Sequence, residues 1–443
     1  MSRSPKWLTI LLVAALVVST FTAVQAVKPF ASEAAESIKI FTDALAIIHT
    51  KYVEEISLTD LVYNALDGML VKLDPHSAFM RPDEMREMSI DTRGKFEGLG
   101  IEITIRDNFI SVISPIDGSP AAEAGLQPGD FIVKIESEST RGMSLLDAVK
   151  RLRGAAGTKV KIQVWRKGWT DPHEYELTRA KIVVKTIREK NLEPGYGYVK
   201  VSQFNENTDV GLRQAIESLQ KQGGNLKGLV LDLRNNPGGL LDQAVKVSDL
   251  FVDEGLIVYT KGRGDGPEFN ALASKVGTFA EFPIVVLINA GSASASEIVA
   301  GCLQDHHRAI IVGERSFGKG SVQTIIPLSD GSGMRLTTAK YFTPNGRDIQ
   351  AKGIEPDLFV PGDPYAGMDE NRRKMLREAD LDRHLKGADD EKSPDDAVDV
   401  PPISPEDGKP AGAEGPEDPQ LDTALRVLKA WPAFQKAATA TAN

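Results

Sequence analysis

The pattern of hydrophobic and polar residues divides the chain into three structured segments. Across residues 31–88, apolar side chains recur at helical spacing, and the run Leu73-Asp74-Pro75-His76-Ser77 ends the second of two predicted helices. Across residues 90–182, short apolar runs alternate with turns that contain glycine and proline, which predicts a β-rich domain. Across residues 185–360, strand and helix patterns alternate. We therefore expect an α/β protein (α+β overall) of several domains, preceded by a helical segment.

A serine lies at one predicted strand-to-helix junction of the α/β segment. Residues 284–288 are consecutive apolar residues, which predicts a buried strand, and a turn rich in glycine and serine follows them. From Glu297 to Leu303 the apolar residues have helical spacing, so Ser294 is expected where the strand turns into the helix. Such a junction exposes a hydroxyl and directs helix N–H groups towards developing negative charge.

A lysine follows the next predicted strand, residues 309–313. Lys319 is flanked by Gly318 and Gly320, which allow close backbone approach. If the segment is extended, Lys319, Ser321 and Gln323 point to one face. A lysine whose pKa is lowered by burial can serve as the base that a serine nucleophile needs. The spacing thus favours a Ser–Lys dyad, while a tight turn with a solvated lysine is the alternative.

A glycine pair follows a third predicted strand, residues 226–233. The loop Arg234-Asn235-Asn236-Pro237-Gly238-Gly239 precedes a predicted helix. Glycines in such a loop free backbone N–H groups to face a ligand, which an oxyanion hole requires. The alternative is a strand-to-helix turn without chemistry.

Two of these motifs resemble the signature of the carboxyl-terminal processing peptidases. They are Ser-Ala-Ser-Ala-Ser-Glu-Ile, which begins at Ser292, and Phe-Gly-Lys-Gly-Ser-Val-Gln, which begins at Phe317. The resemblance extends over roughly residues 38–357 and implies a ClpP/crotonase-like catalytic core without metal or cofactor. It also implies specific roles: nucleophile for Ser294, general base for Lys319, which lies 25 residues later, orientation of that lysine for Gln323, and oxyanion donors for Gly238 or Gly239 and for Ala295.

The β-rich segment resembles a PDZ domain. The resemblance rests on the order of its predicted elements and on a Pro-Ala…Ala-Gly-Leu…Pro-Gly-Asp pattern between Pro120 and Asp130. PDZ domains add a peptide C-terminus to an exposed strand edge and hold its carboxylate with backbone N–H groups. The matching loop consists of Gly98, Leu99, Gly100 and Ile101. The resemblance implies substrates with apolar C-termini.

The negative charge of the chain lies mostly near its C-terminal end. The formal net charge is −10, and residues 387–420 hold eleven Asp and Glu against two Lys, a net of −9. The remainder is nearly neutral, which argues against a nucleic-acid-binding face. The same segment has seven prolines and no aromatic residue, so we expect a disordered linker. An amphipathic helix over residues 421–437 then docks either on the body of the protein or on a partner.

The single cysteine and the N-terminal sequence bear on where the protein is located. One cysteine, Cys302, excludes an intramolecular disulfide and is expected to be buried. Arg3 and Lys6 precede an apolar run, and small residues follow it, so residues 1–26 read as a signal peptide cleaved after Ala26. An uncleaved membrane anchor is the alternative. Either way, we expect an exported protein of the periplasm or cell envelope.

Two other functions compete with an exported endopeptidase. A catalytically silent PDZ scaffold would have no need for the serine, lysine, glutamine and glycine loop together. A Ser–His–Asp hydrolase would use His306 or His307, but on the same helix these lie roughly 18 Å from Ser294. Residues 31–70 carry a wide apolar stripe, and the family includes oligomers, so we expect a homo-oligomer. An envelope adaptor protein is a further possible partner.

Overall fold

The computed structural model describes residues 35–263, 269–279, 282–362, 376–387 and 418–441. The contacts divide the chain after Leu73 into two compact units. In the first unit, residues 35–51 are helical. Helix α2 (Leu58–Val71) follows and begins at Ser57, whose hydroxyl accepts the N–H of Asp60 at 3.0 Å. This capping explains where α2 begins.

The helices of the first unit expose the apolar side chains that the sequence pattern predicts. The exposed set is Ile38, Ile40, Phe41, Ile47, Ile48, Tyr52, Val53, Leu58, Met69, Val71 and Leu73. The predicted signal peptide, residues 1–26, lies outside the described residues. Within the described ranges, no helix has both the length and the apolar character needed to cross a bilayer.

The second unit contains a β-rich domain with its own core. Its main sheet has the order β3-β4-β5-β7-β8, with β6 paired to β5, and a separate pair joins β2 to β9. The bounds are β2 (Lys95–Gly98), β3 (Ile101–Arg106), β4 (Phe109–Pro115), α4 (Pro120–Glu123), β5 (Phe131–Ile135), β6 (Glu138–Ser139), α5 (Leu145–Leu152), β7 (Lys159–Trp165), β8 (His173–Thr178) and β9 (Ala180–Val183). The prediction of a β-rich domain built from short strands and turns is confirmed.

The α/β segment is built on a six-stranded sheet of order β10-β11-β12-β15-β16-β19. All neighbouring pairs are parallel except β10 with β11. The bounds are β10 (Ile187–Glu193), β11 (Tyr196–Val201), β12 (Gly228–Asp232), β15 (Ile284–Ile288), β16 (Ala309–Gly313) and β19 (Leu358–Phe359). The three central strands coincide with strands predicted from apolar runs. Such runs are continuous because the sheet is covered on both faces.

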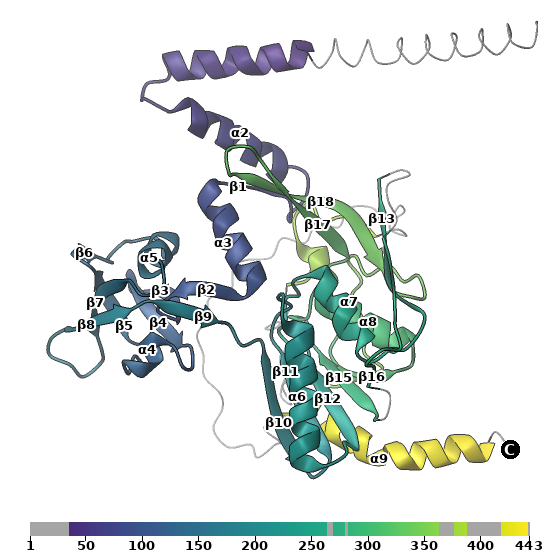
Figure 1. The fold of residues 1–443 in the computed structure, drawn as a ribbon. Helices are drawn as coiled ribbons and strands as arrows, with labels where there is room; N and C mark the ends of the chain where they lie inside the picture. The colour runs from purple at the N-terminus through teal and green to yellow at the C-terminus, as the bar shows by residue number, and fades with distance from the viewer. Residues whose placement is uncertain (1–34, 264–268, 280–281, 363–375, 388–417, 442–443) are drawn as a thin grey trace, which may run out of the picture. The chain divides into compact units, whose positions relative to one another are not determined.

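Helices cover the two faces of this sheet through alternate residues of its strands. On β15, Ile284, Val286 and Ile288 face a core shared with α6 (Thr208–Gly223), α7 (Leu241–Asp249) and α8 (Ala295–Asp305). Val285 and Leu287 face the C-terminal helix α9 (Pro419–Thr441), drawn in yellow in Figure 1. Cys302 is buried on α8, as predicted.

Helix α9 thus docks on the six-stranded sheet of its own chain, so of the two alternatives left by the sequence the structure has docking on the body of the protein. Ala424 and Leu428 are fully buried against the sheet. Arg234 holds the start of the helix, because its Nη2 lies 2.7 Å from Asp232 Oδ2 and 2.8 Å from Asp418 Oδ2. Of the predicted linker, residues 388–417 lie outside the described residues, and Asp418 and Gln420 at its end already contribute to this docking.

A second sheet, which the sequence pattern did not predict, completes the core. Its order is β1-β18-β13-β14, with β17 paired to β18. The bounds are β1 (Ala78–Met80), β13 (Leu256–Gly262), β14 (Asn270–Leu272), β17 (Ser321–Pro327) and β18 (Gly333–Phe342), and two short helical elements accompany it, α3 (Pro82–Arg93) and η2 (Glu378–Asp380). The prediction of helix up to residue 88 is therefore wrong at β1, which pairs with β18. Long-range pairing overrides the local helical pattern there.

The docking of α9 predicts a specific loss of stability. Leu428→Ala should lower the free energy of unfolding by about 2–5 kcal/mol, because it opens a cavity against the sheet. Arg426→Ala, on the exposed side of the same helix, should change it by less than about 1 kcal/mol. Chemical denaturation measures both. Equal, small effects of the two substitutions would contradict the docking.

Candidate active site

Three loops meet at the carboxyl edge of the parallel sheet, because each follows one of three neighbouring strands. Residues 233–240 follow β12, residues 289–294 follow β15, and residues 314–320 follow β16. Hydrogen bonds tie the loops together. The Ala293 N–H donates to Asn236 O at 3.0 Å, and the Phe317 N–H donates to Ser292 O at 3.0 Å. The three motifs found in the sequence are therefore brought into one place.

Ser294 lies between the β15 loop and α8, at the junction that the sequence predicts. Its backbone has φ 55° and ψ −113°. A positive φ is uncommon for a residue with a side chain, and it costs on the order of 1–3 kcal/mol. Such strain persists only where the surroundings enforce it, which is typical of functional sites. At Ser294 the enforcing groups are the two loops on either side.

The buried carboxylate of Glu297 joins the serine loop to the lysine loop. Its Oε2 accepts the N–H of Ser294 at 2.8 Å and the N–H of Lys319 at 2.9 Å. Its Oε1 accepts the N–H of Gly318 at 2.7 Å and the hydroxyl of Ser316 at 2.5 Å. Because the Ser294 and Lys319 amides donate to the same oxygen atom, the two backbones are held side by side.

The protonation state of Glu297 determines how well its four hydrogen bonds join the serine loop to the lysine loop; we call this connection the joint. All four of its neighbours are donors, so the ionised form, which only accepts, satisfies them best. Burial opposes the charge and raises the pKa of Glu297 from 4.5 to about 7, although the four hydrogen bonds act to lower it. A proton on this carboxyl would remove one acceptor and weaken the connection between the loops.

Lys319 lies half-buried between two glycines. Gly318 has φ 102°, and a Cβ atom on Gly320 would lie 2.5 Å from Gln350 N, so the predicted close approach is confirmed. Among the residues that the structure describes, none forms a hydrogen bond or ion pair with the Lys319 ammonium group. Burial lowers the pKa of Lys319, and the positive charge of Arg335 lowers it further. A lysine that acts as a base requires a shift in this direction.

The glycine pair lies directly against the serine turn. A Cβ atom on Gly238 would lie 2.8 Å from Ser294 Cβ and 2.9 Å from Ala295 N. The Gly238 N–H already donates to Asn236 Oδ1 at 2.9 Å. The N–H groups of Gly239 and Ala295 donate to no other residue in the described part of the chain. Of the three predicted oxyanion donors, these two are therefore free in this arrangement.

Gln323 contacts Ser321 rather than the lysine. Its Nε2 donates to Ser321 Oγ at 2.9 Å and reaches Thr337 Oγ1 at 3.5 Å. No hydrogen bond joins it to Lys319 among the described residues. Ser321 and Gln323 therefore lie on one face, as expected, but Lys319 precedes β17, so the expectation that all three residues share one strand face is wrong. The strand also has an irregularity between Val322 and Gln323.

A buried tyrosine that the sequence analysis did not consider lies beside the serine. Tyr341 on β18 is 2% exposed, and its hydroxyl has no well-formed hydrogen bond within the described ranges. The side chain of Ser294 is a polar neighbour of that hydroxyl, and burial raises the pKa of Tyr341 well above its ordinary value. The residue is thus a neutral phenol on the wall of the site.

The predicted PDZ loop borders an apolar groove beside a free strand edge. Strand β3 lies at the end of its sheet and pairs only with β4 among the described strands. The groove is lined by Phe96, Leu99, Gly100, Ile101, Ile103, Val149, Leu152 and Arg153, whereas Gly98 pairs with Ala180 between β2 and β9. The N–H groups of Leu99 and Gly100 donate to no described residue. An extended peptide could add to this edge.

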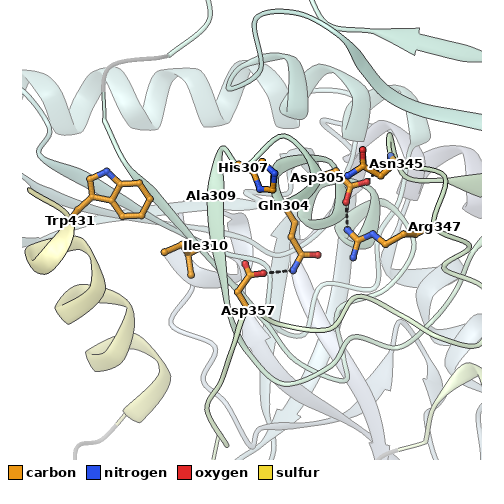
Figure 2. A pocket seen from close by; sticks show the side chains of 9 residues that line it. All are labelled: Gln304, Asp305, His307, Ala309, Ile310, Asn345, Arg347, Asp357 and Trp431. Atoms are coloured by element: carbon orange, nitrogen blue, oxygen red, sulfur yellow. Dashed lines mark hydrogen bonds and ion pairs between the residues drawn. The ribbon is translucent and has the colours of Figure 1, made fainter. Parts of the chain in front are cut away.

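A second hollow, of about 510 Å³, lies at the opposite end of α8 from Ser294. Figure 2 shows Trp431 of α9 on one side, and Gln304 bonded to Asp357 and Asp305 paired with Arg347 on the other. His307 lines this hollow, and His306 Nε2 lies 2.7 Å from the backbone oxygen of Leu256. At 1.5 Å per helical residue, neither histidine reaches Ser294. The Ser–His–Asp alternative is therefore excluded for these two residues.

Sequence reasoning missed the role of Glu297, although a signal was present. The spacing Ser-x-x-Glu from Ser294 is that of a capping box, in which the glutamate accepts the N–H of the N-cap residue. Tyr341 gave no such signal, because only β-strand pairing brings it to the serine. Within the described ranges, no three His, Cys, Asp or Glu side chains are arranged to hold a metal ion.

Comparisons with known protein families agree with the division of the chain into a helical segment, a β-rich domain and an α/β core. Residues 195–360 match peptidase family S41, residues 111–166 match the PDZ domain, and residues 14–84 match the N-terminal domain of the activating protease CtpB. These three matches correspond to the catalytic core, the β-rich domain and the N-terminal helical segment.

Curated relatives match over most of the chain. A carboxy-terminal-processing protease of Bartonella bacilliformis is 44% identical over 397 residues, which are 88% of this chain and 87% of that protein. The carboxy-terminal processing protease CtpA of Bacillus subtilis is 37% identical over 320 residues, 72% of this chain and 68% of that protein. Among solved structures, a photosystem II D1 C-terminal processing protease is 34% identical, covers 72% of this chain and 92% of its own, and has a TM-score of 0.43.

The contacts of Glu297 predict what its amide analogue will do. Glu297→Gln leaves buried donors facing an NH₂ group, at about 1–3 kcal/mol for each unpaired donor. We expect lower stability and lower activity, whereas Glu355→Gln, at an exposed ion pair, should leave both nearly unchanged. Denaturation and peptide hydrolysis measure the two effects. Wild-type activity in Glu297→Gln would show that the joint is dispensable.

The pH dependence of stability has a definite sign. Because the pKa of Glu297 is higher in the folded protein than its ordinary 4.5, its contribution is fully present below pH 4.5 and is lost as the pH rises through about 7. Glu297→Gln should remove this part of the slope. An unchanged slope between pH 4.5 and 7 would contradict the raised pKa.

Proposed function

The chain belongs to peptidase family S41 and is a carboxyl-terminal-processing serine peptidase, and we propose that Ser294 and Lys319 carry out its reaction. The observation that carries the proposal is the shared acceptor: one oxygen of Glu297 accepts the N–H of both residues. The strained backbone of Ser294 and the lowered pKa of Lys319 support the same assignment.

Each residue then has a defined part in peptide hydrolysis. Neutral Lys319 takes the proton of the Ser294 hydroxyl as the oxygen attacks the scissile carbonyl carbon. The N–H groups of Gly239 and Ala295 donate to the oxyanion of the tetrahedral intermediate. Protonated Lys319 then gives its proton to the leaving amine, and an acyl-enzyme remains on Ser294. In the second half, Lys319 removes a proton from water, the hydroxide attacks the ester, and the proton returns to the serine oxygen.

Gly238 and Gln323 have supporting parts in this proposal. The Gly238 N–H is bonded to Asn236, so Gly238 serves chiefly by allowing the glycine loop to approach Ser294 and Ala295 closely. Gln323 orients the lysine loop through Ser321.

The PDZ domain offers a site for the C-terminus of a protein substrate. The free edge of β3 can accept an extended peptide, and the N–H groups of Leu99 and Gly100 are available for its terminal carboxylate. The groove is apolar, with Ile101, Ile103 and Val149 among its lining residues. We therefore propose that substrates have apolar C-termini and that no metal or nucleotide takes part.

Export remains a proposal that rests on the N-terminal sequence. The basic residues, the apolar run and the small residues before Val27 are typical of a signal peptide. Substrates, and an adaptor if one exists, would then be proteins of the cell envelope. N-terminal sequencing of protein recovered from the periplasm should begin at Val27, and retention of Met1 would favour an anchor instead.

The dyad predicts which variants lose activity. Ser294→Ala should reduce cleavage of an unfolded protein with an apolar C-terminus to background, and Lys319→Ala should reduce it on the order of 10²–10⁴-fold. Lys319→Arg should be equally inactive, because a guanidinium does not release its proton. Gel electrophoresis of the digested substrate measures the cleavage rate of each variant. Full activity of Lys319→Arg would contradict the Ser–Lys dyad.

Peptide binding, measured beside hydrolysis, distinguishes a peptidase from a catalytically silent scaffold. The Ser294→Ala protein should still bind a peptide with an apolar C-terminus in a fluorescence titration, and a C-terminally amidated peptide should bind more weakly. If wild-type protein binds such peptides but cleaves no substrate at any pH, the scaffold alternative is the better account.

The exposed helices of the first unit predict self-association. Many of their apolar side chains are exposed, along the stripe that the sequence pattern predicts, and α9 already packs against the sheet of its own chain. We propose that a second copy covers this stripe. Light scattering at micromolar concentration should give at least the mass of a dimer, and deletion of residues 31–70 should reduce it to one chain. If the protein without the deletion already has the mass of one chain, the proposed oligomer is ruled out.

A further inference from the structure

Glu378 is buried beside the lysine loop, although it comes after the catalytic core in the sequence. It is fully buried, and its N–H donates to Phe317 O at 3.2 Å. The preceding residue strengthens the docking, because Arg377 Nη1 donates to the backbone oxygens of Arg315 at 2.9 Å and Ser316 at 2.7 Å. The short segment around η2 therefore packs along the loop that leads to Lys319.

The Glu378 carboxylate also holds the other side of that loop. Its Oε1 accepts Gln350 Nε2 at 2.8 Å, and Gln350 Oε1 accepts the N–H of Gly320 at 3.0 Å. Glu378 thus binds Phe317, two residues before Lys319, directly, and Gly320, one residue after it, through Gln350. The base is bracketed from both sides.

A turn from the start of the second unit anchors this carboxylate. The Nε2 atom of His76 lies 2.8 Å from Glu378 Oε2 and 2.9 Å from Oε1. The turn is rigid, because Asp74 Oδ1 accepts the N–H groups of His76 and Ser77, both at 2.8 Å. The same turn holds a cation, since Arg335 Nε donates to the backbone oxygen of His76 at 2.9 Å. His76 lies in the run that the sequence analysis identified only as the end of a helix, and the contact of its imidazole with Glu378 is an addition to that role.

Four charged side chains act on Lys319, each from a different element. They are Arg335 on β18, Glu378 in η2, Glu297 on α8 and Asp74 in the turn before β1. After burial, which is the largest effect and lowers the pKa of Lys319, Arg335 lowers it and the three carboxylates raise it. Glu297 has the separate task of joining the loops. Arg335 and Glu378 are the two groups of opposite charge that the His76 turn fixes together.

We propose that Glu378, which holds the Lys319 loop, and Arg335, which the His76 turn fixes beside it, are a pair of positioning residues that balance the charge around the amine of Lys319. The proposal rests on the function proposed above, in which Lys319 is the base. A base works best when its pKa lies near the working pH. Burial and Arg335 lower the pKa of Lys319, and the Glu378 carboxylate opposes this lowering, so the two charges together set the pKa. The chain obtains both charges from segments far from Lys319 in the sequence.

The two charges should move the pH profile in opposite directions. We would measure kcat/KM from pH 5 to 11 with a short chromogenic peptide, for the full chain and for Glu378→Gln, Arg335→Gln and Arg335→Lys. Removing the negative charge should shift the midpoint of the rising limb to lower pH. Removing the positive charge should shift it to higher pH. Each shift should be about 0.5–1 pH unit. Arg335→Lys keeps the positive charge, so its midpoint should stay close to that of the wild-type protein.

Glu297 titrates near neutral pH, so the lysine limb must be identified. The midpoint of an amine depends strongly on temperature, and that of a carboxyl group hardly does. Profiles at two temperatures therefore assign the limb. Glu193→Gln, at an exposed ion pair with Lys429, is the control and should not move either midpoint.

The outcomes separate this inference from the dyad itself. Opposite shifts in Glu378→Gln and Arg335→Gln support the pair, even if the overall rate falls, because a midpoint does not depend on amplitude. Unmoved midpoints, or shifts in the same direction, overturn it while an inactive Lys319→Ala leaves the dyad intact. Should Glu378→Gln fail to fold, Arg335→Gln against Arg335→Lys decides alone. An active Lys319→Ala would overturn the dyad instead.

Discussion

The active-site arrangement depends on one buried carboxylate. Glu297 is the third residue after Ser294, at the start of α8, and it accepts four hydrogen bonds from two loops. Without it, the loop that carries Lys319 would have no acceptor for its amides at the point where it passes the serine. Removing an acceptor from buried donors costs more than an average hydrogen bond contributes, because the donors are left without water. The joint is therefore a strong geometric constraint.

The sheet makes this joint possible. Parallel strands β12, β15 and β16 are neighbours, so the loops that follow them emerge at the same edge. Both faces of the sheet are covered, one by α6, α7 and α8 and the other by α9. Arg234, which precedes the glycine loop, is fixed by Asp232 of β12 and Asp418 at the start of α9. The C-terminal helix thus stabilises the scaffold that holds the three loops of the candidate site.

Much of the fold could be predicted because its signals are local. The strands β12, β15 and β16 and the junction at Ser294 follow from continuous apolar runs and from turns that contain glycine. The place of β1 in the second sheet could not be predicted, since β1 pairs with β18 across more than 250 residues. The same limit applies to the site. Ser294, Lys319 and the glycine pair have sequence motifs, whereas the contact of His76 with Glu378, 302 residues apart, has none. Gln323 shows that a motif can give a position without giving the contact.

The central claim is that Ser294 is a nucleophile activated by Lys319, and covalent labelling tests it most directly. The protein would be treated with a serine-reactive fluorophosphonate at a pH where it cleaves substrate, then digested and analysed by mass spectrometry. The account predicts one labelled residue, Ser294, and loss of that label in the folded Lys319→Ala protein. A label on another residue, or an equal rate of labelling without Lys319, would contradict it.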